Sequence, residues 1–142
     1  MSSIVASRKE SAAELLKLLA ERDRRNRRRR LFSLYPETGP LRRELYVKHM
    51  QFFALGMADE ERLMLAGNRI GKTESIGGFE VTLHLTGLYP WWWPGYRFTR
   101  PIKAWAAGAT GETVRDIIQA KLFGPPDDRG TGLIPHACLG RI

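Results

Sequence analysis

The sequence predicts an α/β fold that follows a helical, basic N-terminal segment. Two short apolar segments of strand length, 62–66 and 102–107, each precede a stretch with helical spacing of its apolar residues. A glycine-rich turn connects the first segment to its helix, as in a strand–turn–helix unit. A breaker, Tyr35 to Pro40, separates these units from the first helix. We therefore expect a basic helix and linker at 1–40 and the α/β part at 41–142.

The first helix is expected to run from Ser11 into a cluster of arginines. Ser11-Ala-Ala-Glu14 matches a capping box, and four leucines follow at spacings that one helix face can present. The run from Arg24 to Arg30, with Asn26 among the arginines, has two interpretations. It contacts DNA phosphates by displacing their counterions, or it is a solvated helix end that keeps the chain soluble. Both remain open.

A second helix is predicted at 41–55. Leu45, His49 and the Phe52–Phe53 pair fall on one side of it, and Gly56 is suited to end it. The segment 62–66 then reads as a short buried strand.

The next helix is predicted at 73–85, although Gly77 and Gly78 reduce its intrinsic stability. These two glycines let the helix lie close to the sheet, or they mark a local kink.

The aromatic turn at 89–95, with three tryptophans between two prolines, is either a stacking surface for a base or a hydrophobic plug over the sheet edge. We favour the plug. After the second strand, at 102–107, Thr110 is placed to cap a helix that Gly124 and two prolines end. The tail, 127–142, shows no clear element.

Residues 66–73 match the pattern of a phosphate-binding P-loop, except that Ala66 stands at the usual first glycine. Glycines let successive backbone N–H groups curl around a phosphate, and the following helix adds its N-terminal dipole. Lys72 would reach the β- and γ-phosphates, and the Thr73 hydroxyl would bind Mg²⁺. The sequence thus predicts ATP and Mg²⁺ as ligands. The residues predicted to bind the nucleotide are Gly67, Asn68, Arg69, Ile70, Gly71, Lys72 and Thr73.

Lys72 and Arg69 are the candidate catalytic residues. Arg69 places a second cation in the loop, where it would stabilise the charge of phosphoryl transfer or point outward to a carboxylate. Hydrolysis also needs an acidic residue at the end of an apolar strand, and no such residue follows position 100. Glu74 suits the first helical turn better than water activation. We expect little or no turnover from these residues.

Composition narrows the class of protein. A formal charge of +8 and a pI near 10.1 favour an anionic partner such as nucleic acid. Cys138 is the one cysteine, so an intramolecular disulfide is impossible, and the three histidines lack metal-ligand spacing. No apolar run is long enough for a bilayer and no signal peptide is evident, so we expect an intracellular location without a membrane partner.

Several stretches resemble one family in order along the chain. They are "ERLMLAGNRIGKTES", "EVTLHLTGLYPWWWPGYRF", "RPIKAWAAGATGETVRDIIQAKLFGP" and "GTGLIP". Together these resemble the large terminase subunit of tailed phages over about residues 44–142. The loop is shared with many ATPases, whereas the tryptophan–proline turn and the helix after it are more specific. The first 40 residues contribute little.

The resemblance implies an ATPase core of the additional-strand P-loop type that pumps double-stranded DNA into capsids, followed by a nuclease. It implies that Lys72 and Thr73 are the phosphate and Mg²⁺ residues, and that Arg69 senses the γ-phosphate. It also implies an adenine contact near Tyr46 to Phe53. The implied partners are double-stranded DNA, the portal protein and the small terminase subunit, in a homo-oligomeric ring in the host cytoplasm.

The family's acidic strand, coupling motif and nuclease would lie beyond Ile142. We therefore expect a truncated gene, a prophage remnant or an incomplete gene sequence. Its P-loop core would be incomplete, and it would bind ATP or ADP at best. Three rival interpretations remain: a basic nucleic-acid-binding module driven by Arg24 to Arg30, a remnant without function, and another P-loop ATPase such as a helicase. The resemblance of the tryptophan turn and of the helix "ETVRDIIQ" argues against the last.

Overall fold

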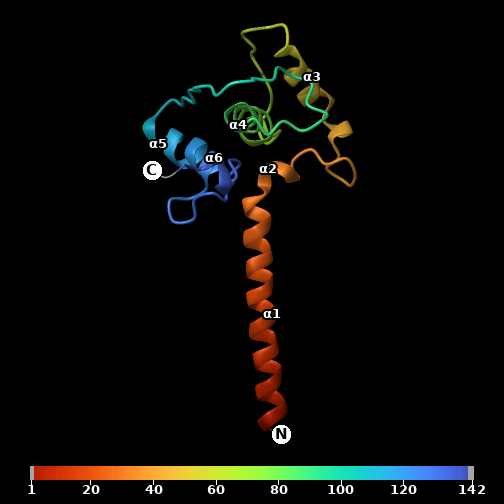
Figure 1. The fold of residues 1–142 in the computed structure, drawn as a ribbon, viewed down its shortest axis with the longest axis vertical. Helices are drawn as coiled ribbons and strands as arrows, with labels where there is room; N and C mark the ends of the chain where they lie inside the picture. Colours follow the sequence, from red (N-terminus) through yellow and green to blue (C-terminus); the bar gives the residue numbers. More distant parts are fainter. Residues whose placement is uncertain (1, 141–142) are drawn as a thin grey trace.

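A computed structural model describes residues 2–140, with side chains from Ala12 onward. Its helices connect through extended segments and turns (Figure 1). In chain order the elements are α1 (Ser2–Arg28), α2 (Arg30–Ser33), η1 (Arg43–Leu45), α3 (Val47–Leu55), η2 (Lys72–Gly78), α4 (Phe79–Thr86), α5 (Gly111–Thr113), η3 (Val114–Gln119), α6 (Ala120–Phe123) and η4 (His136–Cys138).

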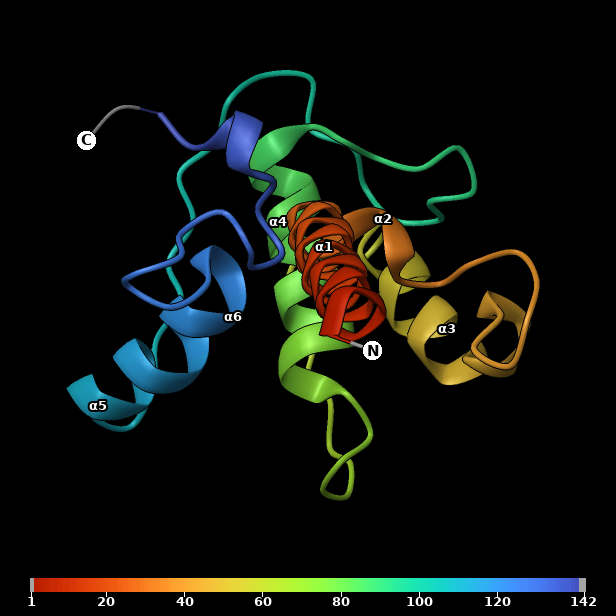
Figure 2. The ribbon, with the colours of Figure 1, turned by 90° about the horizontal axis from the view of Figure 1, so that it is seen from below.

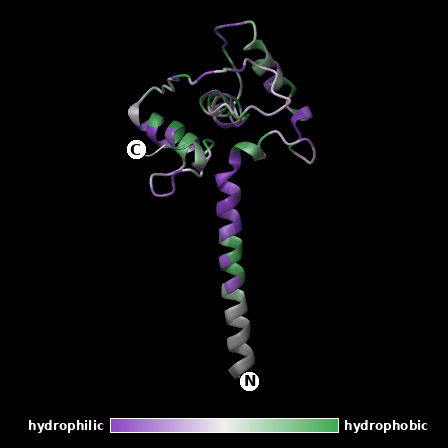
Figure 3. Cartoon of the chain, viewed as in Figure 1, coloured by the Kyte–Doolittle hydropathy of each residue, from purple (hydrophilic) through white to green (hydrophobic). Residues whose placement is uncertain are grey.

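Helix α1 projects from a compact head formed by the rest of the chain (Figure 1). It has 27 residues, which corresponds to a length of about 40 Å. Between residues 12 and 27 every side chain is exposed except that of Leu19, which is half-buried. In the part of α1 that carries side chains, a hydrophobic stretch lies farther from the head than the hydrophilic stretch that adjoins it (Figure 3). The helix begins at Ser2, so the predicted start at Ser11 is wrong.

The head is organised around the continuous helix formed by η2 and α4. Viewed along α1, α2 and α3 lie on one side of α4, whereas α5 and α6 lie on the other (Figure 2). Each side has its own apolar cluster. The first contains Leu31, Tyr35, Phe53, Ile76, Phe79, Leu83 and Trp93, and the second contains Leu122, Leu133 and Ile134.

The predicted α/β class is wrong: residues 2–140 contain no β-strand, and the described chain is all-helical. The predicted strands 62–66 and 102–107 have no regular secondary structure and pair with no neighbour. Leu65 is 84% exposed and Trp105 is 97% exposed. A strand needs a partner for its N–H and C=O groups, and these segments have apolar, strand-like sequences without one. The expected incomplete P-loop core of the additional-strand type is therefore not the fold of the described residues.

The helix predictions agree better with the structure than the strand predictions do, because local signals define the ends of a helix. The segment 41–55 divides into η1 and α3, and Gly56 is the C-cap of α3. The helix predicted at 73–85 is present as η2 and α4 together. The Thr110 side chain accepts a hydrogen bond from the Thr113 N–H at 3.1 Å, so the predicted cap is confirmed.

The two glycines in the central helix differ in their surroundings. A Cβ on Gly78 would lie 2.7 Å from the Thr73 carbonyl oxygen and 2.8 Å from Leu133 Cδ1. At Gly77 the nearest atom would be the Lys72 carbonyl oxygen at 3.4 Å. Gly78 thus permits close packing, but against the segment around Leu133 and not against a sheet. The local irregularity is also present, since η2 is a π-helix.

The aromatic turn packs against α3 and α4. The described residues contain no sheet edge, so the expected plug over a sheet edge is not what the turn forms. Trp93 is 5% exposed and its ring lies 4.7 Å from that of Phe53. Trp91 is exposed, and its Nε1–H donates to Glu37 at 3.1 Å. The tail contributes to the packing of the head although no element was expected in it, since residues 131–134 are buried.

Candidate functional site

The loop 66–73 leads from the extended segment 62–66 into η2, and its residues 67–70 are exposed. Arg69 and Gly71 both have left-handed backbones, with φ of 64° and 84°. Left-handed residues within a turn aim neighbouring N–H groups toward one concave side, an arrangement that suits an anion. A Cβ on Gly71 would also lie 2.8 Å from Ser75 Oγ, so glycine is required there on two grounds.

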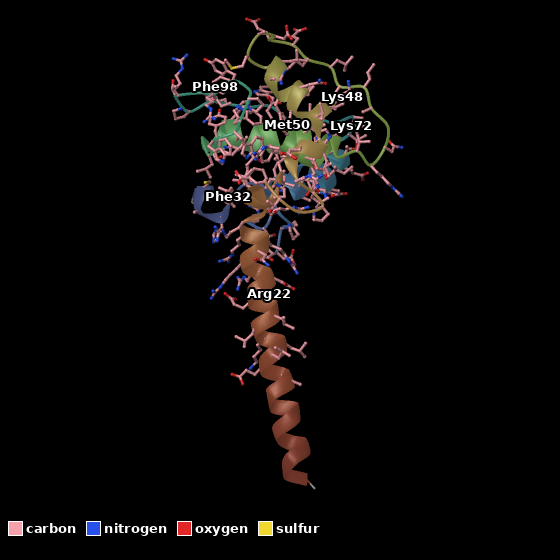
Figure 4. The ribbon with its side chains drawn as sticks, turned by 90° about the vertical axis from the view of Figure 1, so that its right-hand side faces the viewer. Arg22, Phe32, Lys48, Met50, Lys72 and Phe98 are labelled. Atoms are coloured by element: carbon pink, nitrogen blue, oxygen red, sulfur yellow. The ribbon has the colours of Figure 1, made fainter. Side chains whose placement is uncertain are left out.

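Lys72 is the first residue of η2, and its ammonium donates a hydrogen bond to the carbonyl of Ala66. This contact joins the two ends of the loop and keeps the charge of Lys72, whose side chain is half-buried, next to the loop. Figure 4 shows Lys72 in the head, which also contains Lys48 and Met50 of α3. Lys72 is thus positioned to meet an anion that enters the loop.

Thr73 follows directly in the first turn of η2, where backbone N–H groups lack partners within the helix. It also lines a cavity of about 200 Å³ with Gly77, Gly78, Val81, Trp105, Ala106, Ala107, Ile118, Lys121 and Leu122. Within the described residues no group of three or more His, Cys, Asp or Glu side chains is arranged to hold a metal. A Mg²⁺ ion at Thr73 would therefore depend on phosphate oxygens and water for its remaining ligands, which is how Mg²⁺ commonly binds.

Arg69 is exposed and forms no ion pair with the described residues. Its left-handed backbone is uncommon outside glycine and asparagine. The carboxylate pairing considered for it is not seen in this part of the chain. Its predicted role at the γ-phosphate stays a prediction.

Behind the loop, Tyr35 and His49 form a buried pair. The Tyr35 hydroxyl lies 2.7 Å from His49 Nδ1 and donates to the carbonyl of Ser75. Burial lowers the pKa of His49, and hydrogen bonding to the backbone of Ile70 acts in the opposite direction. The pair thereby connects the linker and α3 to both ends of the Ile70–Ser75 segment.

Glu74 lies one residue beyond Thr73 and is held by two cations. Arg30 of α2 donates to one carboxylate oxygen, and Lys121 of α6 donates to the other at 2.8 Å. Burial acts to raise the pKa of Glu74, but the hydrogen bond from Lys121 and the charge of Arg30 outweigh it, so the pKa is lowered. Glu74 lies in the first turn of η2, as expected.

A second ionic cluster fixes the extended segment that precedes the loop. Arg62 donates to the Phe52 carbonyl at 2.8 Å and to the Glu80 carboxylate at 2.9 Å. His84 Nε2 lies 3.5 Å from the same carboxylate. Arg62 thus attaches the approach to the loop to α3 and α4.

The candidate site contains more than the sequence motif indicated. The loop residues are contiguous, so the fold was not needed to bring them together, and the structure adds Tyr35, His49 and the cations around Glu74. His49 had a signal, because a histidine on the apolar face of a predicted helix needs a buried partner. Tyr35 and Arg30 had no signal, since nothing local indicates their contacts with residues 40 or more positions away.

Comparison with known proteins identifies a class and then a relative. The chain is homologous to a phage terminase large subunit. That relative is the "Terminase, large subunit" of Salmonella phage P22, which is 34% identical over 141 residues and covers 89% of this chain. The chain spans about a quarter of the relative's length, 26%. No family model matches the chain, and no solved structure matches it.

The resemblance expected from the quoted stretches is thus confirmed. No described helix is long and apolar enough to cross a membrane.

Proposed function

We propose that this chain is part of a terminase large subunit, a DNA-packaging protein, and that its loop 66–73 binds the phosphates of ATP with Mg²⁺. The homology supports the first statement at the level of the class. The loop geometry supports the second, and Lys72 carries it. Its ammonium closes the loop against the Ala66 carbonyl and lies where an anion would approach.

The proposed binding follows from the charges and donors around the loop. Phosphate oxygens would replace the Ala66 carbonyl as the acceptors for Lys72, and the N–H groups at the start of η2 would add uncharged donors. The Thr73 hydroxyl would be the single protein ligand of Mg²⁺. Arg69 would contact the γ-phosphate, and a contact with adenine would come from the segment 46–53, as the resemblance implies.

Direct titration of the chain with a ribose-labelled fluorescent ADP, in the presence of Mg²⁺, tests this proposal. We expect Lys72→Ala to weaken binding by about tenfold or more, because a hydrogen bond to a charged group contributes about 1.5–3 kcal/mol. Lys103→Ala is the control, since Lys103 is an exposed lysine that lies outside the loop. Equal affinities of the wild type and Lys72→Ala would refute the nucleotide site.

Binding without turnover is the proposed behaviour of this chain. A carboxylate that activates water must be free to accept a proton. Glu74, the acidic residue adjacent to the loop in sequence, is engaged by Arg30 and Lys121. We expect no phosphate release above that of Lys72→Ala, and ATPase activity that depends on Lys72 would contradict this part of the proposal.

A second candidate function is a contact between α1 and double-stranded DNA. The observation in its favour is that α1 projects from the head (Figure 1) and that Arg22, Arg24, Arg25 and Arg27 on it are exposed. Arg24, Arg27 and Arg29 are exposed and form no ion pair with described residues, whereas Arg25 pairs with Glu21 at 3.1 Å. Arg30 forms an ion pair with Glu74.

This contact is tested by the salt dependence of DNA binding. Each phosphate contact adds about 0.9 to the slope of log affinity against log salt, so the double variant Arg24→Ala, Arg27→Ala should lower the slope by about 2. Lys72→Ala should leave it unchanged. An unchanged slope in the arginine variant would favour the solvated helix end instead. Portal protein, small subunit and ring formation remain proposals from the resemblance.

A further inference from the structure

We infer that Tyr35 and His49 are positioning residues for the loop 66–73, setting its conformation from behind without touching the ligand. This inference rests on the proposed function, because it names what keeps the phosphate-binding loop in shape. Three observations carry it: the burial of the pair, the peptide groups it holds, and the strained backbone of Tyr35.

Both members of the pair are shielded from water. Tyr35 is 5% exposed and His49 is 6% exposed. The Tyr35 ring meets those of Tyr46, Phe53, Phe79 and Trp92 with centroids 5.1–5.9 Å apart. Water therefore cannot replace the hydrogen bond between the two polar groups if it is lost. Burial thus favours the one arrangement in which the two groups bond each other.

The single hydroxyl proton fixes the direction of the hydrogen bonds. The Ser75 carbonyl can only accept, so the Tyr35 hydroxyl donates to it. The hydroxyl oxygen can then accept from His49 when the ring carries its proton on Nδ1. A directed chain therefore runs from His49 through Tyr35 to Ser75.

Ser75 transmits this constraint to the residue that precedes Lys72. Its N–H donates to the Gly71 carbonyl at 2.8 Å, and the Ile76 N–H donates to the same oxygen at 3.2 Å. The Ser75 residue is thus held through its carbonyl by Tyr35 and through its N–H by Gly71. His49 also lies beside Gly71, with Cε1 3.8 Å from the position of a Cβ there.

The backbone of Tyr35 supports a role beyond simple packing. Its φ of 55° is left-handed, which is rare for a bulky residue and persists only when its surroundings impose it. The side chain is thereby directed into the cluster between α3 and η2. Tyr35 is thus held by α3 and in turn holds the start of η2.

The test compares two tyrosines that form the same kind of contact. Tyr89 bonds His84 Nδ1 at 2.9 Å and accepts from the Phe98 N–H at 3.0 Å, in another part of the head. We expect Tyr35→Phe to weaken binding of the labelled ADP with Mg²⁺ by about tenfold, as when hydrogen bonds behind metal ligands are removed. Tyr89→Phe should retain wild-type affinity. Equal affinity of wild type and Tyr35→Phe, or equal losses in the two variants, would overturn the inference.

His49 supplies the rescue. The amide of His49→Asn can donate to the Tyr35 hydroxyl from nearly the position of Nδ1, whereas His49→Ala cannot. Positioning therefore predicts that the Asn variant binds ADP more tightly than the Ala variant, with both folded by circular dichroism. Identical affinities in the two variants would contradict it.

Amide hydrogen exchange in the unliganded chain separates this inference from the proposed function. Should the wild type and Lys72→Ala both fail to bind nucleotide, the proposed function fails, but the positioning of the loop is still measurable. We expect Tyr35→Phe to accelerate exchange at 70–76 and to leave exchange at 120–123 unchanged. Uniform acceleration along the head, or none, would overturn the inference.

Discussion

The adjacent glycines of η2 give a prediction in which one substitution has opposite effects at neighbouring positions. Replacing glycine by alanine inside a helix stabilises it by about 0.8–1 kcal/mol. At Gly77, which is exposed, the new methyl group would meet the Lys72 carbonyl oxygen at an ordinary 3.4 Å. We therefore expect Gly77→Ala to raise the free energy of unfolding by about 0.5–1 kcal/mol.

At Gly78 the same methyl group would meet atoms that cannot easily move. The Thr73 carbonyl oxygen at 2.7 Å belongs to the helix backbone, and Leu133, at 2.8 Å, is completely buried. Overpacking of this kind costs about 1–3 kcal/mol, against the same gain in helix propensity. The net loss at Gly78 is about 0–2 kcal/mol, so the two variants should differ by about 1–3 kcal/mol.

Thermal unfolding of the two variants, followed by tryptophan fluorescence, measures this difference. It corresponds to a gap in Tm of about 4–12 °C, with Gly77→Ala the more stable. The reasoning would be refuted if the two variants had equal Tm values, because Leu133 and Thr73 would then have moved aside at no cost.

The remaining predictions concern the titrating groups around the loop. Glu74→Gln should lower the free energy of unfolding by about 1 kcal/mol at neutral pH and low salt, since it loses two partly exposed ion pairs. Glu44→Gln, at an exposed pair, should change little, and equal losses would contradict the bridging role. Because folding lowers the pKa of Glu74, its contribution to stability is fully present above about pH 4.5, the ordinary pKa of a glutamate. This contribution is lost as the pH falls through the lower pKa of the folded state. The pKa of His49 is lowered too, so the unfolded chain takes up its proton first and stability declines as pH falls below 6.5. Urea unfolding between pH 7.5 and 5.5 should show a shallower decline for His49→Asn, and parallel curves would show that His49 does not titrate as expected.

Helix ends were predictable because the groups that define them lie within a few residues of each other. The Thr110 cap bonds the N–H of Thr113, and Gly56 and Gly124 stand directly after their helices. Strands were not predictable in this way. The short apolar run in 62–66 has the length of a strand, but a strand also requires a neighbour that sequence alone does not provide.

The supports of the loop were beyond local inference for a similar reason. The motif at 66–73 predicts which groups would meet a phosphate, and these groups are neighbours in the sequence. Tyr35 reaches Ser75 only because α2 and α3 pack on one side of the central helix. The burial of Leu133 depends likewise on the missing side chain at Gly78, and the glycine-rich tail gives no sign of it.

Because α1 projects from the head, the helix and the head should unfold in two different ways. Most helical stability in proteins comes from tertiary packing, yet side chains 12–27 of α1 face solvent almost throughout. This part of α1 therefore depends on its own propensity and on contacts such as Arg25–Glu21, as an isolated peptide helix does. It should melt gradually, by a helix–coil transition, while the head unfolds in a single step. Far-ultraviolet circular dichroism will report the sum of the two processes, whereas the tryptophans, all of which lie in the head, report only one.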